Sequence, residues 1–171
     1  MRKTIKIIGI VGFVICLIIM YATDSGIPGI QKYDPNFRLL DMQFNYDAEV
    51  VYNTFEKIGN SGREAYQNFL LLDFVFIFCF LITMLVITAK VFSYPRTRTF
   101  FVWICVLRAL FDILENILLL VMLNSYPLFN YLLATMCSWI TTLKFVALYA
   151  WILGIIIRFI KSACSIQQNK P

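Results

Sequence analysis

Five charged side chains lie inside long runs of apolar residues, where a charge is costly. They are Asp73, Arg108, Asp112, Glu115 and Lys144. Even on the lenient insertion scale, a charged residue at the centre of a membrane helix costs about 2.5–3.5 kcal/mol. We therefore expect these side chains to face one another or water rather than lipid.

Three of these charges and Asn116 share one face of a predicted helix. Arg108 precedes Asp112 by one helical turn, Asp112 precedes Asn116 by one turn, and Glu115 lies two turns after Arg108. Residues at these spacings lie on one side of a helix. Two neighbouring carboxylates could act as general acid and base or hold a divalent metal. The chain has no His and no third clear ligand, and it lacks nucleotide-binding and nucleophile motifs, so we expect neither metal nor cofactor.

The candidate ligand-binding residues extend from this face toward an outer loop. At about 1.5 Å of rise per residue, Lys144 lies near mid-membrane and Asp73 lies nearer the outer surface. The turn that holds Arg63 and Tyr66 lies above Asp73, so we expect Arg63 to reach down to Asp73 or Glu115. The full set is Arg63, Tyr66, Asp73, Arg108, Asp112, Glu115, Asn116 and Lys144.

These buried charges are open to three interpretations. They could tie the helices together through internal pairs. They could instead line a small polar pocket, open outward and covered by the outer loop, that binds a small ligand or a lipid headgroup. Asp112 and Glu115 could also carry protons or ions. Three acids against two bases slightly favour a cationic guest.

The predicted function is non-enzymatic. We expect a small-ligand-binding, lipid-binding or accessory protein with a polar pocket between the second, third and fourth spans. The alternatives are a membrane-embedded lipid-modifying enzyme that uses carboxylates, and an oligomeric transporter coupled to protons or ions. Expected partners are membrane lipids, a small ligand or lipid headgroup, and a membrane protein or further copies of this chain. The basic residues are scattered over loop ends, so we expect no nucleic-acid partner.

The composition places the chain among integral membrane proteins. Its 171 residues are 60% hydrophobic and 15% charged, whereas a soluble domain is closer to half apolar and a quarter charged. Four of the five Cys fall in apolar segments and none in the long polar loop. We expect them to be small buried side chains rather than disulfide partners.

The predicted fold is all-α, a single domain of four membrane-spanning helices. The spans are residues 5–22, 69–89, 100–123 and 128–160, each near or above the length needed to cross a bilayer. The first resembles a signal peptide but lacks a good cleavage site, so we expect it to be retained. With both termini inside, the inner segments carry nine basic and no acidic residues, and the outer loop 23–68 carries four basic and seven acidic. This asymmetry predicts cytoplasmic termini.

Local signals predict structure in the outer loop and turns. We expect residues 24–35 to be irregular, a helix over residues 47–58 that ends at Gly59, and a capping box from Ser61 to Glu64 that starts the next helix. A short outer turn should place Pro127 at the start of the fourth helix. Trp103 and Trp151 should lie in an interfacial aromatic belt.

Several motifs resemble a group of small prokaryotic four-helix membrane proteins of uncharacterised function. They are Asp41-Met42-x-Phe44-x-Tyr46, Ile58-Gly59-x-x-Gly62-Arg63-x-x-Tyr66, Leu72-Asp73 and Asp112-x-x-Glu115-Asn116. The chain departs from that pattern at Phe76-Ile77, where the group has Phe-Pro, and at Asn45, where it often has Gly. A fainter analogy links the chain to sterol-isomerase-like proteins of the sigma-2 receptor type, with an acid near the head of the second helix. The main resemblance implies a four-helix architecture, the positions of the site residues and, because the group is prokaryotic, a bacterial plasma membrane.

Overall fold

The chain forms long α-helices joined by short turns and one longer loop. A computed structural model describes residues 3–44 and 46–168, with side chains described up to residue 161. Its helices are α1 (Lys3–Ala22), α2 (Ile27–Gln31), the 3-10 turn η1 (Leu40–Met42), α3 (Ala48–Val91), α4 (Pro95–Ser125) and α5 (Tyr131–Gln168). The described residues contain no strand, which confirms the predicted all-α class. Among residues used above, Arg2, Asn45 and Lys170 lie outside the described residues.

Three segments are long and apolar enough to cross a membrane. They are Lys3–Gln31, Ala48–Val91 and Tyr131–Lys161, which fits the predicted membrane location. The apolar sequence of α4 is interrupted by Arg108, Asp112 and Glu115, all of which are buried inside the protein.

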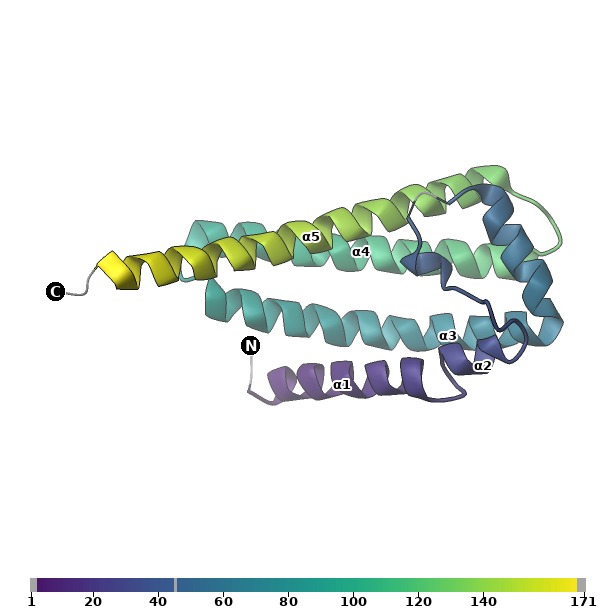
Figure 1. The fold of residues 1–171 in the computed structure, drawn as a ribbon, viewed down its shortest axis with the longest axis horizontal. Coiled ribbons are helices and arrows are strands. Elements are labelled where there is room, and N and C mark those ends of the chain that lie inside the picture. The colour runs from purple at the N-terminus through teal and green to yellow at the C-terminus, as the bar shows by residue number, and fades with distance from the viewer. Residues whose placement is uncertain (1–2, 45, 169–171) are drawn as a thin grey trace.

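The four long helices lie side by side along one axis (Figure 1). Helix α3 packs against α1, α4 packs against α3, and α5 packs against α4. The start of α1, the end of α5 and the turn between α3 and α4 lie at one end of the bundle. The segment from α2 to η1 and the first part of α3 cover the opposite end, which we call the capped end.

Small residues let α1 approach α3 closely. A methyl group added at Gly9 would collide with Ile82, and one added at Gly12 would collide with the sulfur of Cys79. Small residues at such positions are typical of helix contacts in membranes, where close packing replaces the hydrophobic effect.

Helix α3 turns sharply at Gly59, as its sequence predicted. Gly59 has φ 64° and ψ −172° and is the only non-helical residue inside α3. The predicted capping box is wrong, because Ser61 lies within the helix instead of at a non-helical cap position. The turn sends residues 48–58 across the capped end as a short separate helix (Figure 1).

Three further local predictions need correction. The segment expected to be irregular contains α2, with Pro28 at its start. Helix α5 begins at Tyr131 instead of near Pro127, and the side chain of Asn130 accepts a hydrogen bond from the Leu133 amide at 3.1 Å. Trp151 is 6% exposed and donates to Thr88 Oγ1 at 2.8 Å, so it ties α5 to α3 instead of facing the interface.

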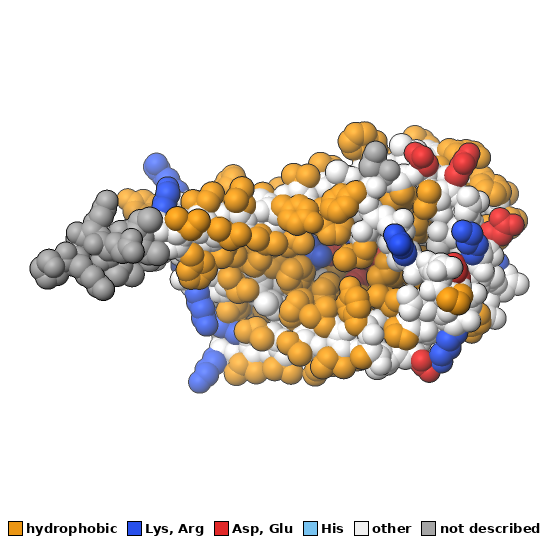
Figure 2. Space-filling model, in the orientation of Figure 1, with side chains coloured by type: hydrophobic (Ala, Val, Ile, Leu, Met, Phe, Trp, Pro, Cys, Tyr) orange, Lys and Arg blue, Asp and Glu red, His pale blue; other side chains and the backbone are white. Residues whose placement is uncertain are grey.

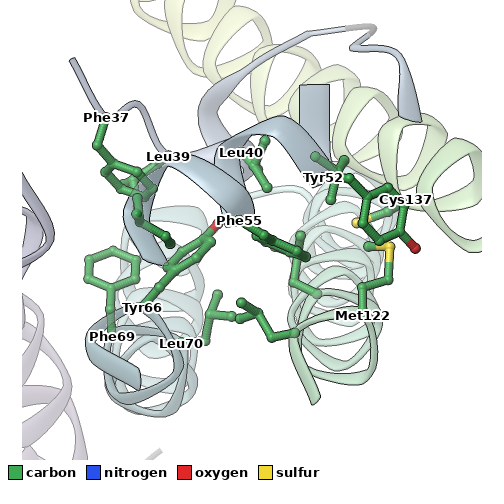
Figure 3. Close-up of a cluster of buried hydrophobic side chains, with 14 of the residues drawn as sticks. Phe37, Leu39, Leu40, Tyr52, Phe55, Tyr66, Phe69, Leu70, Met122 and Cys137 are labelled. Carbon is green, nitrogen blue, oxygen red and sulfur yellow. The ribbon is translucent and has the colours of Figure 1, made fainter. Parts of the chain in front are cut away.

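Two apolar clusters lie at different heights in the bundle. The larger cluster fills the capped end, where side chains from the loop, α3, α4 and α5 meet (Figure 3). The smaller one is centred on Met84, Cys105 and Trp151. Cys16, Cys79, Cys105 and Cys137 are buried and free, as predicted. Along α3, α4 and α5, the stretch between the two clusters carries the buried charges.

We expect Gly59→Ala to lower the free energy of unfolding by about 1–3 kcal/mol. No atom lies within 4 Å of the added methyl group, so the loss would come from backbone conformation alone. Gly59→Asn should be equally harmful. Asn tolerates the left-handed helical region, but Gly59 combines a positive φ with a ψ near 180°, and only glycine adopts that combination readily. Thermal unfolding of the detergent-solubilised protein measures both, with the exposed Lys57→Ala as control. Wild-type stability of Gly59→Ala would contradict this account.

Candidate functional site

The ammonium group of Lys144 is the centre of the buried charges. Its Nζ lies 3.0 Å from Asp112 Oδ1 and 2.5 Å from Glu115 Oε2. It also donates to the main-chain oxygen of Asp41 at 2.8 Å. A lysine has three N–H donors; two of them are hydrogen-bonded to Glu115 and to the Asp41 main chain, and Asp112 adds an ion pair. Lys144 is 3% exposed.

Glu115 is fully enclosed by its partners. Its side chain is 0% exposed. One carboxylate oxygen accepts from the hydroxyl of Thr141, and the other binds Lys144. Thr141 and Lys144 lie one turn apart on α5, so Glu115 joins α4 to α5.

Arg108 pairs with Asp112 on its own helix. Nη2 of Arg108 lies 2.6 Å from Asp112 Oδ2, and the guanidinium lies over the ring of Phe80 at 4.5 Å from its centroid. The Nε and Nη1 atoms of Arg108 are buried without a hydrogen-bond partner among the described residues. Asp112 thus lies between two cations, Arg108 and Lys144.

Asp73 joins α3 to α4 through Asn116. The amide nitrogen of Asn116 donates to Asp73 Oδ2 at 2.7 Å, and both residues are buried. Among the described residues Asp73 forms no ion pair, because the nearest basic groups bind Asp112 and Glu115 instead.

Asp41 is a member of the site that the sequence analysis did not select. It belongs to η1 of the outer loop, and it is 6% exposed. Its Oδ1 atom has no hydrogen-bond partner among the described residues. Burial raises the pKa of the Asp41 carboxyl above its ordinary value, although the nearby Lys144 ammonium opposes the rise. The sequence signal that could have identified Asp41 is its position directly after two leucines, Leu39 and Leu40. Both leucines are buried in the structure.

The expected reach of Arg63 to the buried acids is wrong. Its Nη1 donates to the carbonyl oxygen of Phe55 at 2.8 Å and its Nη2 to the side chain of Asn60. Its guanidinium also lies 4.2 Å from the centre of the Tyr126 ring. Arg63 therefore completes the end of the short helix before Gly59, where a carbonyl would otherwise lack a helical partner.

Tyr66 is also part of the capped end. It is 0% exposed and lies edge-on to Phe37, with ring centres 5.2 Å apart. The structure thus brings six of the eight predicted residues into one layer and places Arg63 and Tyr66 in the packing above it.

A cavity of about 160 Å³ opens onto this charged layer. Its polar surface comes from five charged residues, Asp41, Asp73, Arg108, Asp112 and Lys144. Its apolar walls come from α1, α3, α5 and the outer loop and include Leu17, Met20, Phe69, Phe76, Phe80 and Phe145. Figure 2 shows charged atoms at the bottom of a hollow in the otherwise apolar side of the molecule. Neither Glu115 nor Asn116 lines it.

The chemistry available in the cavity is electrostatic recognition beside an apolar surface. Within residues 3–44 and 46–161, no group of three or more His, Cys, Asp or Glu side chains is placed to hold a metal ion. The layer contains four carboxyl groups, from Asp41, Asp73, Asp112 and Glu115, and only two basic groups. The carboxyls therefore exceed the resident cations by two.

Comparison of the chain with protein-family models, with curated proteins and with solved structures found no match. The four-helix resemblance inferred from the motifs therefore stays a prediction.

We expect Lys144→Met to lower the free energy of unfolding by about 3–5 kcal/mol, because Asp112 and Glu115 would lose a buried cation. The double variant Lys144→Met/Glu115→Gln should recover part of that loss, because it removes one of the uncompensated charges. Denaturation in detergent measures the cycle, and the exposed Lys161→Met serves as control. Unchanged stability of Lys144→Met, or strictly additive losses in the double variant, would contradict the assigned contacts.

Proposed function

We propose that α1, α3, α4 and α5 all cross the membrane, with both termini in the cytoplasm of a bacterial cell. Helix α4 lies between α3 and α5 (Figure 1) and turns its charged face toward them, which supports its insertion despite three charges. The excess of basic residues at the end with the termini supports the orientation. The four-helix resemblance supports the same topology.

Cysteine labelling from outside the cell tests this topology. On a Cys164→Ser background, a membrane-impermeant maleimide should label Glu49→Cys in intact cells, because residue 49 is exposed at the capped end. Lys90→Cys, exposed at the opposite end of α3, should be labelled only after the membrane is permeabilised. Labelling of Lys90→Cys in intact cells would overturn the orientation. The unmodified background is the control, because its four buried thiols should stay unlabelled.

We propose that the protein is a non-enzymatic binding or accessory protein that holds a small ligand or a lipid headgroup in the cavity between α1, α3, α4 and α5. The observation that carries this proposal is the cavity itself, which pairs apolar walls with a charged floor. A purely structural cluster would be expected to fill its own space, as Glu115 does with Thr141 and Lys144. Asp41 and Asp73 instead border open volume.

The cavity volume limits the part of a ligand that it encloses. An engineered protein cavity of about 150 Å³ binds benzene, so 160 Å³ suits a group of roughly that size. A longer molecule would leave its remainder in the lipid beside the cavity. A lipid headgroup or a compact amphiphile meets this limit.

The carboxylate contacts argue against Asp112 and Glu115 as a catalytic pair or as carriers in transport. An acid–base catalyst needs a carboxyl group free to exchange a proton with its substrate. Asp112 and Glu115 are instead held by Arg108, Lys144 and Thr141. The same contacts disfavour the two carboxyls as mobile carriers in a transporter, which leaves the cavity-lining Asp41 and Asp73 as the groups open to a guest.

Native mass spectrometry of protein extracted gently from its own membrane tests ligand binding. We expect a defined small molecule or lipid to co-purify, and Leu17→Trp to reduce its occupancy at least tenfold by filling the cavity. Ile18→Trp is the matched control, because Ile18 is the next residue of α1, is 56% exposed and does not line the cavity. Equal occupancy in both variants, or no bound molecule in wild type, would contradict the proposal.

A further inference from the structure

We infer that the cavity selects an amphiphile that carries a protonated amine, and that this ligand enters sideways from the bilayer between α1 and α5. The inference rests on the proposed function, that the cavity binds a small ligand, and it names the class of that ligand.

The first argument is the missing hydrogen-bond donor beside Asp41. The ammonium group of Lys144 donates hydrogen bonds to Glu115 and to the main chain of Asp41, and it pairs with Asp112 at 3.0 Å. Neither hydrogen bond reaches the Asp41 carboxyl, whose Oδ1 is buried without a partner among the described residues. A buried acceptor left unpaired costs about 1–3 kcal/mol, and an ammonium group in the cavity would supply the missing donor.

The second argument is charge. Asp41 and Asp73 both line the cavity and neither forms an ion pair within the described part of the chain. A single protonated amine between them would reduce the excess of carboxyls over cations in the layer from two to one. A buried carboxyl without a counterion resists ionisation, and an ammonium group would stabilise its charged form, whereas a neutral head would not.

Arg108 is the residue that could favour the opposite ligand. It also lines the cavity, and its Nε and Nη1 atoms lack hydrogen-bond partners. Its positive charge is already balanced by Asp112 at 2.6 Å, and its face lies on the Phe80 ring. An anionic head would therefore meet one cation whose charge is already balanced and two acids without an ion pair, but it could accept from the free N–H groups of Arg108, so the test includes an anion.

The walls explain the apolar part of the ligand and the route. Phe69, Phe76, Phe80 and Phe145 line the cavity, and aromatic faces attract cations as well as alkyl chains. The cavity is lined by residues of both α1 and α5, which lie on opposite sides of the bundle in Figure 1. The hollow in Figure 2 opens on the apolar side of the bundle, midway along its length, where a membrane protein meets lipid tails. A ligand with an alkyl tail can thus place its head on Asp41 and Asp73 while its tail stays in the bilayer.

The test compares three probes of equal chain length on the full-length protein in nanodiscs: decylamine, decanol and decyl phosphate. Binding is measured as the concentration-dependent rise in melting temperature, and by calorimetry. We expect decylamine to bind at least tenfold more tightly than the other two. Asp73→Asn and Asp41→Asn should each weaken decylamine at least tenfold and leave decanol unchanged, and Glu49→Gln, an exposed acid of the outer loop, should change neither.

Each other outcome overturns the inference. If decanol binds as tightly as decylamine, the cavity recognises only the alkyl tail. If decyl phosphate binds more tightly than decylamine, Arg108 is the recognition group. Both results would leave the proposed binding function intact, provided that Leu17→Trp weakens the probe that binds. Failure of all three probes, while a co-purified molecule is still lost in Leu17→Trp, would reject the amine class alone. If Asp41→Asn fails to fold, the binding of decylamine to Asp73→Asn and the ranking of the three probes still test the inference.

Discussion

The contact between Lys144 and its three acceptors is the interaction on which the rest of the structure depends. It joins α5 to α4 through Asp112 and Glu115, and it joins α5 to the outer loop through the main chain of Asp41. Without the ammonium group, the acids of α4 would lie in an apolar environment with only Arg108 to balance them. The apolar clusters above and below can pack because this layer between them is electrostatically matched at most of its positions.

The layer also separates structural from accessible charge. Glu115 and Asn116 lie behind the cavity and hold helices together, whereas Asp41 and Asp73 border the open volume. The interpretations of buried charge as helix contact and as binding site are therefore compatible, since different residues of the same layer serve each. Residues of α1 complete the apolar wall of the cavity. The close approach of α1 to α3 at Gly9 and Gly12 therefore helps to form this wall.

Features that depend on local periodicity could be predicted from the sequence. The long helices, the shared face of Arg108, Asp112 and Asn116, and the turn at Gly59 follow from helical spacing and from a backbone geometry open mainly to glycine. Features that depend on tertiary contact could not. The burial of Asp41 depends on a lysine 103 residues later. The contacts of Arg63 depend on the carbonyl group of Phe55, which the turn at Gly59 leaves without a helical partner. The predicted interfacial position of Trp151 was wrong because its side chain is buried and hydrogen-bonded to Thr88 on another helix.

The bond between Lys144 and the main chain of Asp41 also constrains the order in which the protein assembles. Asp41 leaves the ribosome long before Lys144, so the outer loop cannot reach its final position until the last helix is made. If α4 crosses the membrane as proposed, it would enter alone with two acids and one base, and α5 would enter alone with an uncompensated lysine. The turn of five residues between them, 126–130, lets the two helices enter as one hairpin whose charges already match. On this view the outer loop closes over the bundle as the final step of biogenesis, and the part of the cavity lined by Asp41 exists only from then on.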